Sequence, residues 1–225
     1  MCLVMRNGLI ISPALSETFV PAVNLATIEH KLSRYNHRKK RVRPLLKRSA
    51  VAMILREDES GLRILMIKRA ERDGDPWSGH MAFPGGRMEP VDRHGYDVAV
   101  RETEEEIGLA LTSEDRCIGR LSEIMTHVQL RRRPMVVSPY VFRLDRQASL
   151  QPNYEVAEVV WIPMDYLLDL SNRERMVWNR GSVEIPLSCY MYNNYRIWGL
   201  SLMMIDELLV MLGRKPALPA RAARG

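Results

Sequence analysis

The chain has 225 residues, 46% of them hydrophobic and 27% charged, which is an ordinary balance for a folded soluble protein with one good-sized domain. A formal net charge of +6 favours anionic partners such as nucleotides, nucleic acid or a membrane surface, without choosing among them. The three cysteines, Cys2, Cys117 and Cys189, are too scattered for a disulfide framework or a zinc site, so we expect a reducing, cytoplasmic setting.

The N-terminal part, residues 1–45, is predicted to be an arm outside the main domain. Its first residues lack a small-residue cleavage site, and Glu17 and the uncharged start argue against a presequence. Apolar residues then recur at helical spacing, which predicts a short helix capped by Asn24. No apolar run approaches the roughly 18–20 residues that a membrane helix needs, so we expect no membrane partner.

A basic run follows this helix. It can be a solvated linker, or it can be a patch for nucleic acid or phospholipid. Because no aromatic residues interleave with it, the linker is favoured and no specific nucleic acid is expected. The run comprises Arg38, Lys39, Lys40, Arg41, Arg43, Lys47 and Arg48.

Strands and helices alternate without repeats from residue 46 to 213, which predicts a single α/β domain. Ser49–Arg56 and Leu62–Arg69 are apolar runs joined by a polar turn, and they are predicted to pair as strands. The remaining predictions are strands at 135–144 and 155–162, and helices at 96–107, 163–170 and 198–212. Short strands and turns are predicted at 183–195, with a disordered tail at 214–225.

The helix at 96–107 carries the most informative chemistry. On a helix, Glu102, Glu105 and Glu106 share one face, whereas Glu104 points away. Three like charges repel one another unless a cation lies among them, and Mg²⁺ or Mn²⁺ takes carboxylate oxygens readily. The alternative is a solvated acidic face. We favour the metal site because a Gly-Gly turn precedes the helix and Arg101 opens the acidic run.

The stretch Phe83–Leu109 resembles the Nudix box, G-x5-E-x7-R-E-U-x-E-E-x-G-U, in which U is a bulky apolar residue. It departs from that pattern in three ways. Asp92 stands at the first glutamate, one extra residue precedes Arg101, and Thr103 occupies a bulky apolar position. The resemblance implies a Nudix-like α/β/α sandwich with a mixed sheet between helices. The matching residues are Gly86, Arg101, Glu102, Glu105, Glu106, Gly108 and Leu109.

Within that family, the sequence resembles the coenzyme A pyrophosphatase branch. The shared features are Phe83-Pro84-Gly85-Gly86, Glu89-Pro90 and the Ile197-Trp198-Gly199-Leu200 segment. Upstream, Arg69-Ala70 and Gly79 fit, but the second arginine of that branch is replaced and Arg72 is displaced from its place. Coenzyme A is therefore the leading substrate, while NADH, ADP-ribose, nucleoside triphosphates and diphosphoinositols stay open. A non-catalytic, nucleic-acid-binding Nudix-like module is the alternative from another class.

The resemblance also implies roles for single residues. Glu102 and Glu106 would be the primary metal ligands. Glu105 would hold a further metal or orient water, and Arg101 would pair with a carboxylate of its own helix. For a glutamate outside the box, Glu155 and Glu158 are candidates, although both are interpreted first as strand residues. Substrate contacts are expected from Arg69, Phe83, Gly85, Gly86 and Arg87.

Two further questions stay open at this stage. The arginines at 131–133 could bind substrate phosphates or form a solvated turn. The expected partner is a small-molecule nucleotide, and a homodimer is left open.

Overall fold

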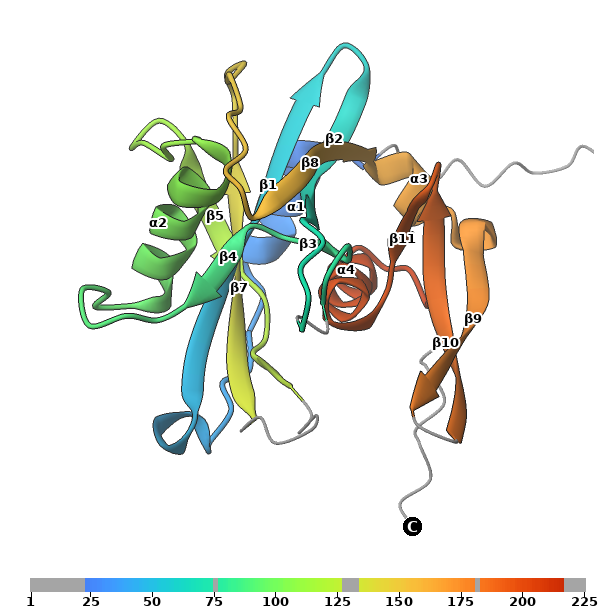
Figure 1. Cartoon of the computed structure of the whole chain (residues 1–225). Helices are drawn as coiled ribbons and strands as arrows, with labels where there is room; N and C mark the ends of the chain where they lie inside the picture. Colours follow the sequence, from blue (N-terminus) through green and yellow to red (C-terminus); the bar gives the residue numbers. More distant parts are fainter. Residues whose placement is uncertain (1–22, 75–76, 127–133, 181–182, 217–225) are drawn as a thin grey trace, which may run out of the picture.

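The fold is built on an eight-stranded mixed sheet with helices on both faces (Figure 1). The computed structural model describes residues 23–74, 77–126, 134–180 and 183–216. The spatial order is β3-β2-β1-β7-β5, with β4 and β6 pairing onto β1 and β7, and β8 onto β2. The strands are β1 (Lys47–Asp58), β2 (Gly61–Arg69), β3 (Met81–Ala82), β4 (Gly85–Arg87), β5 (Arg116–Arg120), β6 (Ile124–Met125), β7 (Met135–Arg143) and β8 (Val156–Pro163).

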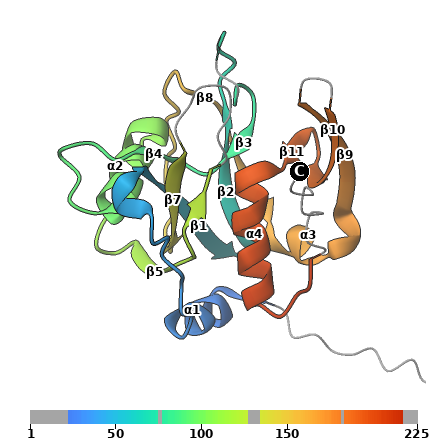
Figure 2. The same ribbon diagram turned by 90° about the horizontal axis from the view of Figure 1, so that it is seen from below.

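Helix α2 covers one face of this sheet, and α1 and α4 cover the other (Figure 2). Side chains of β1 alternate between two cores: Met53 and Leu55 face α1 and α4, whereas Ala52 and Ile54 face α2. This double burial explains why the central strands read as continuous apolar runs. The helices are α1 (Leu25–Ser33), α2 (Gly95–Ile107), α3 (Met164–Leu168) and α4 (Gly199–Met211), with short 3₁₀ turns at Arg43–Leu45 and Leu170–Asn172.

The sheet opens between β1 and β2, and this opening positions the glycines. β1 pairs with β2 only along residues 55–58, near the hairpin turn. Further along, β1 pairs instead with β4, so that Ala50 lies opposite Gly86 and Val51 opposite Gly85. Strand β3 pairs with the far end of β2. The segment from β3 to β4 therefore lies between the two central strands, next to α2.

Most predicted elements are present. Asn24 caps α1 by accepting a hydrogen bond of 2.8 Å from the N–H of Thr27. Leu25, Ile28 and Leu32 of that helix are buried in the core shared with α4, so α1 packs as part of the same body. Pro163 immediately precedes α3 instead of opening it, because its backbone is still extended.

The prediction of strands and turns at 183–195 was right in kind, but the main strand is long instead of short. That region contributes a ten-residue strand to a second, three-stranded sheet of β9 (Arg173–Arg180), β10 (Val183–Tyr192) and β11 (Tyr195–Ile197). Its strands carry charged residues among the apolar ones, which hides the two-residue alternation of a strand. An ion pair of 2.5 Å between Arg173 and Asp206 joins this sheet to α4.

The basic run is held against the domain at its middle. The backbone N–H of Lys40 donates to Glu123 (2.7 Å) and the guanidinium of Arg43 pairs with the same carboxylate (3.1 Å). In the part of the chain that the structure covers, no helix is long and apolar enough to span a membrane. The predictions for residues 1–22, for the arginines at 131–133 and for the tail beyond residue 216 lie outside the described residues.

Candidate active site

Helix α2 is fixed in place at both ends. Asp97 accepts a hydrogen bond of 2.8 Å from the N–H of His94 at the first turn. At the other end Gly108 adopts the left-handed conformation (φ 67°) and donates to the carbonyl of Glu104, as a helix-ending glycine does. Thr103 is fully buried and its hydroxyl bonds the carbonyl of Ala99, so it fills the position where a bulky apolar residue was expected.

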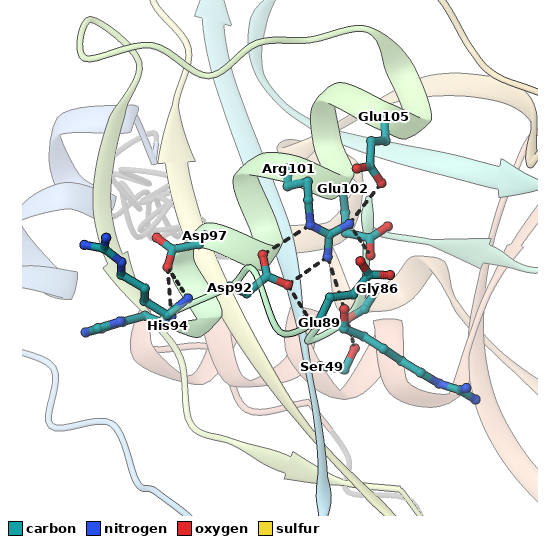
Figure 3. A network of polar contacts seen from close by, with 11 residues as sticks. Ser49, Gly86, Glu89, Asp92, His94, Asp97, Arg101, Glu102 and Glu105 are labelled. Atoms are coloured by element: carbon teal, nitrogen blue, oxygen red, sulfur yellow. Dashed lines mark hydrogen bonds and ion pairs between the residues drawn. The ribbon is translucent and has the colours of Figure 1, made fainter.

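Arg101 is the centre of the polar network on this helix (Figure 3). Its guanidinium donates to both oxygens of Asp92 (3.2 and 2.9 Å) and to the carbonyl of Arg87 (3.2 Å). It also pairs with Glu102 (3.1 Å) and Glu105 (2.9 Å), so the predicted pairing within its own helix is present. Asp92, at the place of the first glutamate, is thus the buried partner of Arg101, and these hydrogen bonds lower its pKa.

Glu106 faces the Gly-Gly turn. Its carboxylate accepts a hydrogen bond of 2.9 Å from the N–H of Gly85, and only 3% of the residue is exposed. Burial raises its pKa to about 7, opposed by the hydrogen bond from Gly85 and the charge of Arg69. An anionic carboxylate is therefore costly here without a cation beside it.

Glu102 lies one turn earlier, against Gly86. A Cβ added at Gly86 would lie 2.1 Å from Oε1 of Glu102, so only glycine leaves room for this carboxylate. Burial raises the pKa of Glu102, partly offset by Arg101, and the charges of Glu105 and Glu155 raise it further. Both glycines thus allow the close backbone approach that the sequence predicted.

Glu155 is the residue whose place the sequence interpretation undervalued. The loop before β8 is bonded to the end of α2, because the N–H of Asn153 donates to the carbonyl of Glu106 (2.9 Å). After burial, Glu155 is among the charges that raise the pKa of both Glu102 and Glu106. Glu158 differs, because Lys68 (2.9 Å) and the hydroxyl of Tyr195 (2.6 Å) both bind it. No sequence signal distinguishes the two glutamates.

Of the other predicted site residues, some lie near the carboxylates and others do not. Arg69 lies close enough to Glu106 to lower its pKa. Glu105 is 54% exposed at its side chain and pairs with Arg101. Phe83 is 3% exposed and packs in the core, so its ring offers almost no surface to a substrate. Arg87 is exposed and contributes its carbonyl to Arg101.

The donor set fits a hard divalent cation through Glu102 and Glu106. Both carboxylates lie beside a glycine backbone, and burial disfavours the charge of each. A cation would relieve that cost and would be bound by carboxylate oxygens and water. Among the residues described, no three acidic, histidine or cysteine side chains are already gathered in metal-binding geometry. Arg101 pairs with two of these carboxylates, Glu102 and Glu105.

The mixed sheet between helices, the glycine turn and the paired carboxylates define a site that can hold a divalent cation beside a phosphate group. The family comparison agrees. The chain belongs to the Nudix family, whose domain model matches residues 46–181.

Curated relatives are similar over part of their length. The human mitochondrial coenzyme A diphosphatase NUDT8 is 32% identical over 151 residues, 66% of this chain and 62% of the relative. The mouse peroxisomal coenzyme A diphosphatase NUDT7 is 30% identical over 62% of this chain and 60% of its own length. An uncharacterised Nudix hydrolase NudL of Enterobacter is 29% identical over 84% of this chain and 97% of its own length. The chain thus spans about three fifths of the two coenzyme A diphosphatases.

Proposed function

We propose that the protein is a divalent-metal-dependent pyrophosphohydrolase that cleaves the phosphoanhydride of a nucleoside diphosphate linked to another group. The observation that carries this proposal is the packing of Glu102 and Glu106 against Gly86 and Gly85. The charge of Glu155 acts on both carboxylates. Coenzyme A or an acyl derivative is the leading substrate. The names of two relatives, both coenzyme A diphosphatases, support that choice.

Mg²⁺ or Mn²⁺ would be held by Glu102 and Glu106, with Glu155 as a third carboxylate. When bound, the cation would neutralise charge on the diphosphate and lower the pKa of a bound water. Glu105 is proposed to act through Arg101 instead of as a direct ligand, because it is 54% exposed and its carboxylate pairs with Arg101 at 2.9 Å.

The chain's own groups have three tasks in this proposal. Gly85 orients Glu106 by donating its N–H to the carboxylate. Arg101 is held by Asp92 and pairs with Glu102, so it is proposed to position the Glu102 carboxylate. Arg69 is proposed to meet the negative charge of the substrate, because it already lies within electrostatic reach of Glu106.

The test is a substrate panel with Mg²⁺ and Mn²⁺. It contains coenzyme A, an acyl-coenzyme A, NADH, ADP-ribose and a nucleoside triphosphate, and the products locate the cleaved bond. We expect coenzyme A to be the preferred substrate and Glu106→Gln to lower kcat by at least about a hundredfold. Glu104→Gln, on the exposed side of α2, is the matched control and should retain activity. Equal turnover by Glu106→Gln and the wild type would overturn the proposal.

The place of the protein in the cell stays a prediction. Cysteine usage favours the cytoplasm, whereas the names of two relatives place those proteins in mitochondria and peroxisomes. We propose a cytoplasmic location, to be tested by fractionation of cells that express the full chain. Homodimer formation is likewise a prediction, to be tested by light scattering of the purified protein.

A further inference from the structure

Tyr154 is an unusually exposed aromatic residue next to the proposed site. Of its surface, 80% is open to solvent, compared with 39% for Tyr96, the other exposed large aromatic in the described part of the chain. Tyr96 packs on Tyr140 and Phe142, at ring distances of 6.1 and 5.8 Å. A large aromatic ring left in water keeps apolar surface that a stacking ligand could cover, with a gain in free energy from its burial.

The position of Tyr154 relative to the carboxylates is fixed by the backbone. Asn153 donates to the carbonyl of Glu106, and its side-chain oxygen accepts from the N–H of Glu155 (2.7 Å). Tyr154 lies between these two anchored residues. It immediately precedes Glu155, whose charge acts on both Glu102 and Glu106. The backbone of Tyr154 therefore lies on a loop that is bonded to the end of α2, immediately before Glu155.

One side of the Tyr154 ring is already covered by a cation. The guanidinium carbon of Arg72 lies 4.8 Å from the ring centroid. Arg72 also donates to the carbonyl of Tyr154 (3.4 Å) and pairs with Glu155 (3.3 Å). These contacts hold the guanidinium over the ring and leave the remaining ring surface open. A flat, electron-rich ring backed by a cation is a suitable surface for stacking a nucleobase.

Trp161, Trp178 and Trp198 are less suited to this role. Trp198 contacts His80 at 5.0 Å and Trp178 at 6.2 Å, so these rings pack on one another. Trp161 carries the guanidinium of Arg56 at 4.5 Å and is only partly exposed, on strand β8. Tyr154 combines a highly exposed ring with direct linkage to the carboxylate cluster.

We propose that Tyr154, backed by Arg72, stacks the purine base of the nucleotide substrate. This inference rests on the proposed function, in which the diphosphate lies at Glu102 and Glu106. The base would stack on the open ring surface, while the sugar and diphosphate extend past Glu155 toward the carboxylates. Stacking tolerates different purines, so the subsite selects for a nucleoside end and leaves the group on the other end of the diphosphate unrestricted.

Adenosine monophosphate and ribose 5-phosphate test the subsite without any turnover, because they differ only by the base. Titration calorimetry of the full chain should give tighter binding of adenosine monophosphate by roughly five- to a hundredfold, the range for stacking on an aromatic ring. Tyr154→Ala should abolish this preference, and Tyr154→Phe should retain it. Arg72→Gln should weaken it by less than Tyr154→Ala does. An unchanged preference in Tyr154→Ala would overturn the proposal.

Kinetics separate this inference from the proposed function. With an adenine-containing diphosphate, Tyr154→Ala should raise KM by roughly tenfold or more and change kcat less than twofold. Equal losses with a diphosphate that lacks a base would argue for a general structural role and against stacking. If the wild type hydrolyses no diphosphate but binds adenosine monophosphate through Tyr154, the proposed function fails and the base subsite stands.

Discussion

The N–H of Gly85 donates a hydrogen bond of 2.9 Å to the buried carboxylate of Glu106. The two residues come from different elements, strand β4 and the last turn of α2, and they meet because β4 pairs with β1 beneath the helix. The single hydrogen bond does not offset burial, which raises the pKa of Glu106 to about 7. The protein thus keeps a carboxylate in a place where its charge is unfavourable, as expected of a residue retained for function.

The first prediction concerns the pH dependence of stability. The folded protein holds the proton of Glu106 more tightly than the unfolded chain, so ionisation destabilises the fold as pH rises from about 4.5 to about 7. Above that range the full cost is present. We expect Glu106→Gln to stabilise the metal-free protein at pH 8 by about 1–3 kcal/mol and to have little effect at pH 4.5.

Urea unfolding with a chelator, at pH 4.5 and pH 8, measures this difference. Glu104→Gln is the control, and it should change the free energy of unfolding similarly at both pH values because its side chain is exposed. If Glu106→Gln is no more stabilising at pH 8 than at pH 4.5, the cost attributed to the buried charge is absent. Added Mg²⁺ should stabilise the wild type more than this variant, since the cation binds the folded carboxylates.

The second prediction concerns Gly86→Ala. Its methyl group would fall 2.1 Å from Oε1 and 2.3 Å from Cδ of Glu102, so the carboxylate has to leave its position. Displacement of a reacting group by about 1 Å costs on the order of a hundredfold in rate, and we expect a loss of that size in kcat/KM. Circular dichroism should show a folded protein. Full activity in a folded Gly86→Ala variant would contradict the placement of Glu102 in the site.

The third prediction concerns Asp92, which binds Arg101 in place of the glutamate expected at the start of the box. Arg101 and the N–H of Glu89 lower the pKa of Asp92, so this carboxylate stabilises the fold above its ordinary pKa. The stabilisation is lost as pH falls through the lowered value. We expect Asp92→Asn to destabilise the protein at pH 7 by about 1–3 kcal/mol. The difference in unfolding free energy between this variant and the wild type should become smaller below pH 4.

Thermal unfolding across pH 3 to 8 measures this effect. Glu59→Gln, in the exposed hairpin turn between β1 and β2, controls for loss of one negative charge and should leave stability nearly unchanged. Asp92→Asn should also lower kcat, because Arg101 would no longer be held against Glu102. If Asp92→Asn is as stable and active as the wild type, the ion pair with Asp92 is not needed to hold Arg101 in place.

The parts of the fold that the sequence predicted are those with local signals. The caps Asn24 and Gly108, the helical spacing of α2 and the apolar run of α4 are encoded within a few residues. The long hairpin of β9 and β10 was missed because its residues alternate irregularly, and its stability depends on distant contacts such as Arg173 with Asp206. Single-sequence periodicity carries no information about such contacts.

The residues of the candidate site show the same difference between local signals, which the sequence predicts, and distant contacts, which it does not. Helical spacing predicted that Glu102, Glu105 and Glu106 share one face, because residues three and four apart are neighbours on a helix. Glu155 was undervalued because it approaches them through a loop that folds back onto the end of α2, through Asn153. Phe83 was expected near substrate, but the opening of the sheet places it in the core. The sequence thus predicts which residues share a face of one helix. It does not predict which residues of different elements lie close together, because that depends on tertiary structure.

The last prediction concerns Glu123, which fixes the basic run to the domain. Its side chain is fully buried and bonded to Arg43 (3.1 Å), Arg120 (3.3 Å) and the N–H of Lys40 (2.7 Å). Loss of its charge leaves two guanidinium groups without their shared carboxylate. We expect Glu123→Gln to cost about 2–4 kcal/mol of unfolding free energy, in the range for breaking a buried ion pair.

The variant Arg43→Gln separates the contribution of Arg43 to stability from that of Arg120. Arg120 still neutralises Glu123 in this variant, and Arg43 is partly exposed, so the loss should be about 1 kcal/mol or less. Chemical unfolding measures both variants, with the exposed Glu114→Gln as a control near zero. If the basic run were a solvated linker with no contribution to the domain, Arg43→Gln and Glu114→Gln would be equally stable. A loss of stability in Arg43→Gln but not in Glu114→Gln means that residues 40–43 contribute to the folded unit, because Arg43 belongs to the basic run whereas Arg120 lies on β5.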